Sequence, residues 1–324
     1  MSKFHSVFLA KNGNVYSCGF GIDGRLGHDN EATLIAPKLI EHLKNEKCIQ
    51  VAASRNNTYF LTAENLIYSC GTNEFKQLGQ TGVQKSLSPR GINLGKMLKA
   101  KQIKQIACSR FHVAILTTSS EVFTFGLNAG QLGHPNEMVA NATSYNISVC
   151  LIETPRLVTS INEPEMDIDA ICCSDGATIC LQRSKNVLHL FNDYKCKRIF
   201  YIKETGSPFK KIRIQGGKLD TFANPDLKWI QDLGREPITI VGLTENNLLF
   251  IWRENETNWR NACWSGRRSL EVADFDLNNQ GLIFCTVQGI CYKADFSKSK
   301  MTKSSSSFNT GSLASNYSSI IFLI

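Results

Sequence analysis

An alternation of apolar runs and short polar turns recurs along the chain and predicts β-hairpins. In residues 112–134 an apolar run at Val113–Leu116 is followed by a serine-containing turn and by a second β-rich run at Val122–Phe125. Short runs rich in β-branched and aromatic residues, joined by a turn, are typical of paired strands. Residues 6–28 and 58–80 repeat the pattern. The three segments therefore predict one structural unit that is used repeatedly.

A fixed spacing extends this unit to the rest of the chain. Fourteen residues separate the start of each first strand from the end of its second strand, and the spacing persists where the glycine at the second position is lost. The pairs at this spacing are His5–Gly19, Asn57–Gly71, His112–Gly126, Ala177–Phe191, Ile238–Trp252 and Gly281–Asp295. They predict six hairpins with turn residues Gly13, Asn65, Ser120, Lys185, Asn246 and Gly289.

Each hairpin after the first is preceded by another β-like stretch. These stretches are Ile49–Ala53, Ile103–Cys108, Ile168–Cys173, Ile212–Ile214 and Val272–Leu277. Repeats of about 40 to 65 residues that consist of strands are typical of β-propellers, whose blades are four-stranded sheets. The sequence therefore predicts an all-β fold, a repeat β-propeller in an incomplete ring over residues 1–296, clear in 1–134 and degenerate in 165–296. The only helix predicted is a short one at Leu39–Lys47.

Two long segments interrupt the repeats, and a third follows them. Residues 135–165 and 215–237 are insertions that serve either partner contacts or tolerated growth of a loop. From residue 297 to 324 the chain is rich in serine and lysine, which predicts a disordered tail whose serines are candidates for phosphorylation.

The composition and the terminal segments limit the expected cellular compartment and the kinds of metal or disulfide chemistry that the chain can carry. A hydrophobic fraction of 42% allows a substantial core. We find no secretory signal, and the terminal apolar run Ile320–Ile324 is too short to span a bilayer, so a cytoplasmic or nuclear setting is expected. Several of the 12 cysteines are in phase with the repeat, as Cys18 is with Cys70 and Cys108 with Cys173, which indicates small buried apolar residues. Neither the cysteine nor the histidine spacing predicts a metal site.

The motifs that could indicate catalysis are better explained by the repeat. Gly19, Gly21 and Gly24 match a dinucleotide-binding pattern, but no convincing helix follows them. His5 and His112 share one repeat position, and His28 and His134 share another, which favours structural hydrogen bonding over catalysis. No nucleophile elbow or metalloprotease helix is found. The sequence therefore predicts a protein without enzymatic activity and without a cofactor.

One phased set of polar residues is a candidate for partner binding. Lys3, Arg55, Arg110 and Asp175 lie between the preceding strand and the hairpin in successive repeats. In a propeller these loops open on one face, so the set forms either a mostly basic binding ring or salt bridges between blades. The net charge of +8 also allows a nucleic-acid binder, whose affinity would depend steeply on salt.

The hairpin ends resemble the repeats of the regulator of chromosome condensation family. Residues 126–133 (GLNAGQLG) show the resemblance most clearly, together with the turn at residues 13–16. The resemblance implies a seven-bladed propeller. It also implies an alternative function, guanine-nucleotide exchange on a small Ran-type GTPase or association with chromatin, although no stretch matches the founding member's wedge hairpin. The turn glycines at equivalent positions are Gly19, Gly27, Gly71, Gly79, Gly126 and Gly133.

A longer set of segments resembles the family of Bruton tyrosine kinase inhibitors. These segments are residues 5–31, 109–112, 126–133, 174–178 and 193–197. The resemblance implies a protein-interaction propeller that binds and restrains a signalling protein such as a Tec-type tyrosine kinase. In longer members it lies between ankyrin repeats and BTB domains, and the BTB domains serve cullin-3 ubiquitin ligases. The sequence contains neither segment and starts inside a repeat, so we expect a fragment or a truncated gene model, and cullin-3 recruitment is not assigned to it.

Overall fold

The structure is a computed structural model that contains side chains. It describes residues 2, 4–134, 150–163, 165–192, 197–202, 205–217, 219, 237–262, 264–265, 268–278, 281–295 and 300–303. Within this part of the chain, none of the helices is long and apolar enough to cross a membrane.

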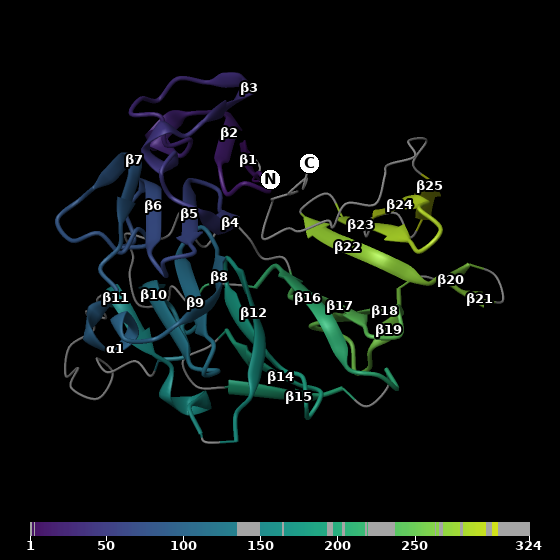
Figure 1. Cartoon of the computed structure of the whole chain (residues 1–324). Coiled ribbons are helices and arrows are strands. Elements are labelled where there is room, and N and C mark those ends of the chain that lie inside the picture. Colours follow the sequence, from purple (N-terminus) through teal and green to yellow (C-terminus); the bar gives the residue numbers. More distant parts are fainter. Residues whose placement is uncertain are drawn as a thin grey trace.

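Six antiparallel sheets follow one another along the chain as the blades of a β-propeller (Figure 1). Blade 1 contains β1 (His5–Leu9), β2 (Val15–Gly19) and β3 (Leu34–Leu39), and blade 2 contains β4 (Cys48–Ala53), β5 (Asn57–Thr62), β6 (Ile67–Thr72) and β7 (Lys85–Gly91). Blade 3 contains β8 (Ile103–Cys108), β9 (His112–Thr117), β10 (Val122–Asn128) and β11 (Cys150–Leu157). Blade 4 contains β12 (Ile168–Ser174), β13 (Ala177–Gln182), β14 (Val187–Phe191) and β15 (Lys197–Tyr201).

Two further blades follow blade 4. Blade 5 contains β16 (Phe209–Gln215), β17 (Thr239–Thr244), β18 (Leu249–Arg253) and β19 (Arg260–Asn261). Blade 6 contains β22 (Val272–Asn278), β23 (Gly281–Thr286), β24 (Cys291–Asp295) and β25 (Lys300–Lys303), and the small hairpin of β20 (Trp264–Ser265) and β21 (Arg268–Ser269) precedes it. The predicted all-β repeat propeller is thus confirmed, with six blades in the described part of the chain.

The predicted hairpin register holds in four blades and is shifted in two. His5 pairs with Gly19, Asn57 with Gly71 and His112 with Gly126, and blade 6 keeps the same spacing. In blade 4 the turn is one residue longer, so that Thr178 rather than Ala177 pairs with Phe191. In blade 5 the spacing of fourteen residues is kept, but both positions lie one residue later than predicted, so that Thr239 pairs with Arg253.

The turn residues follow these shifts. Gly13, Asn65, Ser120 and Gly289 have positive φ, as expected for the third residue of a three-residue hairpin loop. The predictions of Lys185 and Asn246 were wrong by one residue, because Asn186 (φ 50°) and Asn247 (φ 65°) take this conformation instead. Asparagine tolerates the left-handed region better than lysine does, which explains the position in blade 4.

A layer of apolar side chains lies between each pair of neighbouring blades. Residues of blades 1 and 2 form one cluster, and further clusters join blades 2 and 3, blades 3 and 4, blades 4 and 5, and blades 5 and 6. Both faces of each middle strand are therefore covered, and β5, β9 and β13 are buried along their whole length. This two-sided burial explains why these strands are continuous apolar runs in the sequence.

The innermost strands of successive blades are tied by polar side chains. The amide of Gln50 donates to the carbonyl of Ile106 (2.8 Å) and accepts from its N–H (2.9 Å). Gln105, one repeat later, makes the same pair of bonds to Ile171 at 3.0 Å each. Each glutamine thus satisfies the backbone of the next strand on the edge that faces the propeller centre.

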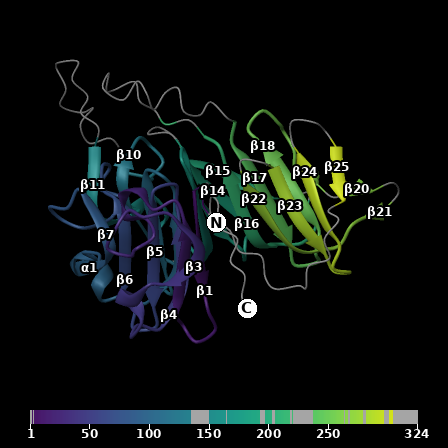
Figure 2. The same cartoon turned by 90° about the horizontal axis from the view of Figure 1, so that it is seen from above.

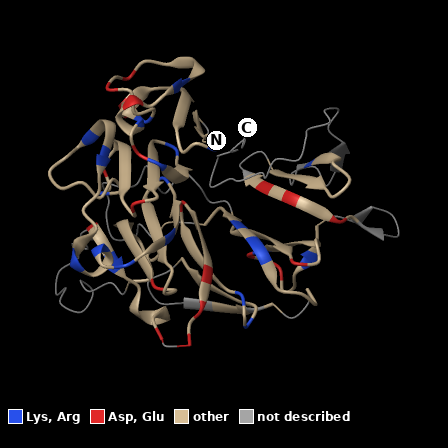
Figure 3. Cartoon of the chain, in the orientation of Figure 1, with Lys and Arg blue, Asp and Glu red and all other residues tan. Residues whose placement is uncertain are grey.

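Charged residues replace the glutamines between blades 5 and 6. Lys211 occupies the repeat position of Gln50 and Gln105, and its ammonium forms an ion pair with Asp274 on β22. Arg213 Nε lies 3.6 Å from Asp276 Oδ1 on the same two strands. Figure 3 shows these basic and acidic segments on the two facing strands β16 and β22. Burial lowers the pKa of Lys211 to about 8, and the neighbouring Arg213 adds to the decrease.

Blade 1 has three strands in the described part of the chain. The strands β1, β2 and β3 correspond to β5, β6 and β7 of blade 2, so the missing strand is the innermost one. Every other blade has an innermost strand, so β1 is an edge strand whose counterparts lie inside their sheets. Figure 1 shows β1 beside the N-terminus and β22 on the other side of it, which makes these the two ends of the ring; Figure 2 shows blade 1 beside blade 2 from above.

Several local predictions have different outcomes. The predicted helix at Leu39–Lys47 is wrong: Leu39 ends β3, and only Glu41–Leu43 (η2) form a 3-10 turn, because Ile40 and Leu43 are both buried between blades 1 and 2. The described α-helix is α1 (Gly95–Lys99). Part of the predicted insertion 135–165 forms β11 and the 3-10 turn Thr159–Ile161 (η3), whereas residues 135–149 lie outside the described residues.

Two further predicted segments are described only in part, and most of the phased cysteines are buried as predicted. Most of 215–237 lies outside the described residues, and of the predicted tail 297–324 only β25 is described. Cys70, Cys108 and Cys173 are buried thiols, whereas Cys18 is half-buried. Cys285 and Cys291 form a disulfide across β23 and β24.

Glycine is required at position 126, inside β10, for two reasons. Its φ is +112°, and an added Cβ would lie 2.4 Å from the carbonyl oxygen of Phe111. We expect Gly126→Ala to lower the free energy of unfolding by about 2 kcal/mol or more, because strain and the steric clash act together. Urea unfolding measures this loss.

Gly91→Ala is the matched control, because no heavy atom lies within 4 Å of its added Cβ and its φ is not in the left-handed region. It should change the stability by less than about 1 kcal/mol. Equal losses in the two variants would contradict the explanation.

Candidate protein-interaction face

The propeller has two faces with different loops. One face carries the loops that join each innermost strand to the next strand, together with the long loops such as β2 to β3. The opposite face carries the three- and four-residue hairpin turns. The predicted partner-binding residues Arg55 and Arg110 lie on the first face, in the β4–β5 and β8–β9 loops. We call Arg25, Arg55 and Arg110 the arginine row, and the face that carries them the arginine face.

A repeated serine turn holds the loops of the arginine row. The N–H of Ser109 donates to the carbonyl of His112 (2.9 Å), and the Ser109 hydroxyl accepts from the N–H groups of Phe111 and His112. Ser54 makes the same backbone bond to Asn57 (2.9 Å) in blade 2. The arginine after each serine is therefore presented at a fixed point of its loop.

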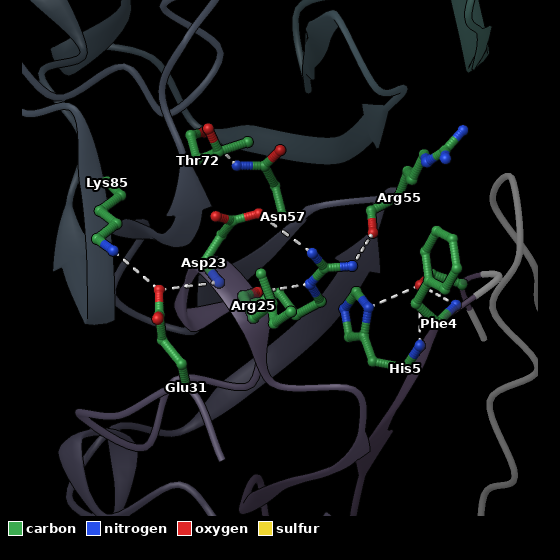
Figure 4. A network of polar contacts seen from close by, with 11 residues as sticks. Phe4, His5, Asp23, Arg25, Glu31, Arg55, Asn57, Thr72 and Lys85 are labelled. Atoms are coloured by element: carbon green, nitrogen blue, oxygen red, sulfur yellow. Dashed lines mark hydrogen bonds and ion pairs between the residues drawn. The ribbon is translucent and has the colours of Figure 1, made fainter. Parts of the chain in front are cut away.

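Arg25 is buried, with 4% of its area exposed, and it is bound on three sides. Its guanidinium donates to the carbonyls of Ile22 (2.7 Å) and Arg55 (3.0 Å) and to the Asp23 carboxylate (3.2 Å). Figure 4 shows these contacts converging from two blades. Burial lowers the pKa of Arg25, Asp23 opposes this change, and the positive charge of Arg55 adds to it.

Aromatic rings line the same part of the face. The Cζ atom of Arg25 lies 5.6 Å from the ring centroids of both Phe4 and Phe20. The Cζ atom of Arg55 lies 5.2 Å from the Phe4 ring, and that of Arg110 lies 5.0 Å from the Phe111 ring. These separations permit cation–π attraction, which orients each guanidinium plane.

The three arginines are close enough to affect one another electrostatically. Burial lowers the pKa of Arg110, and the charge of Arg55 lowers it further, whereas Asp175 and Glu74 oppose the decrease. Arg55 therefore acts on both Arg25 and Arg110, and it occupies the middle of the row.

The other predicted binding residues have different positions. Asp175 is partly buried, and its Oδ1 accepts a hydrogen bond from the N–H of Arg110 (3.1 Å), so it links blades 3 and 4. Lys3 lies outside the described residues. The structure thus brings Arg55, Arg110 and Asp175 together on one face.

The repeated histidines tie neighbouring blades beneath this face. His5 Nε2 lies 2.8 Å from the Thr58 hydroxyl of blade 2, and His112 Nε2 lies 2.7 Å from the Thr178 hydroxyl of blade 4. The second nitrogen of each ring contacts a serine of its own loop, Ser2 or Ser109. Burial lowers the pKa of both histidines to about 3, so both rings are neutral at pH 7.

Reasoning from the sequence missed Arg25, although the repeat contained a signal. Arg25 stands two residues before Gly27, where the next two repeats have Gln77 and Gln131 before Gly79 and Gly133. The Gln77 side chain accepts from the N–H of Phe75 (2.7 Å), and Gln131 makes the equivalent bond. A guanidinium cannot accept a hydrogen bond, so an arginine at this position must bind differently.

The predicted turn glycines lie at the ends of these loops. All have positive φ, with values of 112°, 78°, 120°, 65°, 112° and 75° for Gly19, Gly27, Gly71, Gly79, Gly126 and Gly133. Gly21 of the dinucleotide-like pattern precedes the 3-10 turn Ile22–Gly24 (η1) and Gly24 ends it, and this turn is too short to present a helix N-terminus to a phosphate.

The opposite face contains a pocket of about 450 Å³ between blades 3, 4 and 5. Three of its charged groups pair with one another: Asp169 contacts Lys104 at 2.8 Å and Arg183 at 2.5 Å. This pairing links blades 3 and 4 and leaves the pocket with mixed charge. No group of three potential metal ligands is found among the residues that the structure describes.

Comparison with known proteins explains the repeated loops. The model of the regulator of chromosome condensation (RCC1) repeat matches residues 12–61 and 64–116, and a second RCC1 repeat model matches residues 103–131. RCC1 repeats are thus found within residues 12–131. The resemblance predicted from the hairpin ends is therefore confirmed, and blades 1 to 3 contain the matched repeats.

Curated relatives extend the likeness over nearly the whole chain. The inhibitor of Bruton tyrosine kinase from Mus musculus is 33% identical over 305 residues, which is 94% of this chain and 21% of that protein. The BTB/POZ domain-containing protein 1 of Schizosaccharomyces pombe is 28% identical over 94% of this chain and 22% of its own length. The chain thus spans about one fifth of the length of the curated relatives it matches.

Solved structures show the same fold at lower identity. Prp20p from Saccharomyces cerevisiae, described with its binding properties to Gsp1p and histones, is 14% identical with a TM-score of 0.65, covering 92% of this chain and 71% of that one. Human WBSCR16 is 21% identical with a TM-score of 0.54, covering 66% and 54%. These similarities support the RCC1-type propeller fold.

The buried histidines of the RCC1 repeats should make the fold sensitive to acid. The pKa of His112 is about 3 when folded and about 6.5 when unfolded, so the unfolded state binds more protons below pH 6.5. Stability is therefore highest above pH 6.5 and decreases as the pH falls toward 3. We expect His112→Asn to reduce the loss of stability between pH 7.0 and 5.5 by about 1 kcal/mol. Urea unfolding at the two pH values measures it.

Asparagine is a suitable replacement because Asn57 occupies the same repeat position in blade 2. His42→Asn, which removes an exposed histidine, is the control and should not flatten the pH dependence. A pH dependence in His112→Asn that equals that of the unchanged protein would contradict the assignment.

Proposed function

We propose that the chain is a protein-interaction propeller without enzymatic activity, and that its arginine face docks a signalling protein, a Tec-type tyrosine kinase. The observation that carries the proposal is the arginine row, which three separate loops place together beside aromatic rings. Arginine and aromatic residues dominate the binding energy of protein interfaces.

Exposed apolar residues beside the row support this use of the face. Phe20 is 42% exposed and Ile22 is 43% exposed, although both are large apolar residues next to Arg25. Exposed apolar groups adjacent to arginines are more typical of a docking surface than of a solvated one. The names of the relatives support the choice of partner, since three relatives that match 89–94% of this chain are each named inhibitor of Bruton tyrosine kinase.

Recruitment of cullin-3 is not part of the proposal, because the family resemblance implies it for BTB domains and not for the propeller. The likeness to Prp20p shows the fold alone, so exchange activity on a small GTPase stays a prediction. We assign the complex with the kinase to the cytoplasm.

The test is binding of a purified Tec-type kinase, including its lipid-binding domain, to the full chain. We expect Phe20→Ala to weaken this binding by about tenfold, because truncation of an anchoring aromatic residue removes contact area that no neighbour replaces. Surface plasmon resonance measures the dissociation constant.

The matched control is Ile35→Ala, since Ile35 is fully exposed (100%) on β3 and lies outside the arginine row. It should bind like the unchanged chain. If no binding is measured even at high kinase concentration, the proposed partner is wrong. If both variants weaken binding equally, the contact lies outside this face.

A further inference from the structure

Arg55 differs from its two neighbours in the row in how its charge is compensated. Arg25 has Asp23 at 3.2 Å, and Arg110 has Asp175 and Glu74 close enough to oppose the decrease in its pKa. In the described part of the chain, the Arg55 side chain contacts the Phe4 ring and makes no hydrogen bond or ion pair. Figure 4 shows its guanidinium directed away from the Arg25–Asp23 pair.

The charges around Arg55 make this arrangement unfavourable without an anion. Arg25 comes from blade 1 and Arg110 from blade 3, the two neighbours of blade 2, and the charge of Arg55 lowers the pKa of each. Like charges at such range repel, and partial burial weakens the screening by water and salt. An anion at Arg55 would relieve the repulsion with both neighbours.

The geometry suits one compact anionic group. A guanidinium presents two parallel N–H groups to a carboxylate or a phosphate, and the Phe4 ring fixes the plane of Arg55 from one side. Arg55 is partly exposed, so this fork is accessible. The carbonyl of Arg55 accepts from Arg25, which holds the backbone beneath the side chain.

We propose that Arg55 receives a single anionic side chain, a carboxylate or a phosphate, from the protein that docks on the arginine face. This inference deepens the proposed function and rests on it for the face that is used. A protein is the occupant that the surroundings favour, because Asp23, Glu74 and Asp175 lie among the arginines and would repel an extended polyanion. The exposed Phe20 ring beside the row suits the apolar residues of a polypeptide.

The experiment titrates the full chain with eight-residue peptides that differ at one central position. The peptides carry glutamate, phosphotyrosine, or the neutral glutamine and tyrosine, in an otherwise glycine and serine sequence. We expect at least one anionic peptide to bind about fivefold or more tightly than its neutral counterpart. The preference should diminish between 50 mM and 200 mM salt, because the charges are partly exposed.

Variants test whether the preference for anionic over neutral peptides depends on Arg55. Arg55→Ala should abolish it, whereas Arg55→Lys should retain only part of it, because lysine keeps the charge and loses the fork. The matched control Arg90→Ala removes an exposed arginine from β7 and should leave the preference unchanged. Thermal unfolding of each variant shows whether the fold is retained.

The outcomes separate this inference from the proposed function. Equal affinities for anionic and neutral peptides, or a preference that survives Arg55→Ala, would overturn the inference even if the kinase binds. A preference that depends on Arg55 in a chain that does not bind the kinase would support the inference and reject only the partner. The comparison of the glutamate and phosphotyrosine peptides shows which anion the site takes.

Discussion

The backbone at the centre of the propeller needs hydrogen-bond partners that no strand can supply. Each innermost strand has one edge toward the centre, and buried N–H and C=O groups without partners are costly. Gln50 and Gln105 satisfy this edge at Ile106 and Ile171 from the preceding blade. Each blade therefore completes the next one, and the ring depends on this order.

The same requirement is met by other groups where glutamine is absent. In blade 5 the carbonyl of Ile212 accepts from the Cys172 thiol (3.1 Å) and from Arg213 (2.9 Å). In blade 6 the N–H of Phe275 donates to the Asp274 carboxylate (2.8 Å), which also pairs with Lys211. The rigid centre in turn fixes the loops above it, so that serine turns and neutral histidines present the arginine row at defined points.

The sequence predicted most of the fold because a propeller repeats one local pattern. Apolar runs, turn residues and a constant spacing are local features, and they located the hairpins even where the glycines had disappeared. The spacing did not reveal that the turn of blade 4 is one residue longer, since Lys185 and Asn186 are both compatible with a turn. Of the binding face, Arg55 and Arg110 were predicted from their phase. Arg25 was missed because its proximity to them arises from a loop that folds across from blade 1, which no linear spacing records.

The first blade has three strands in the described part of the chain, and this affects the hydrogen bonding of both blade 1 and blade 2. Val51 stands on β4 where Ile106 and Ile171 stand on β8 and β12, and within the described residues no glutamine of blade 1 makes the corresponding pair of bonds to it. In the described part of the chain, β1 is therefore an edge strand, and β4 is without the glutamine pair that β8 and β12 receive. Edge strands are templates on which a further strand can add. Among the described residues, blade 1 shares an apolar cluster with one neighbour, blade 2, whereas blades 3 and 4 each share clusters with a neighbour on both sides.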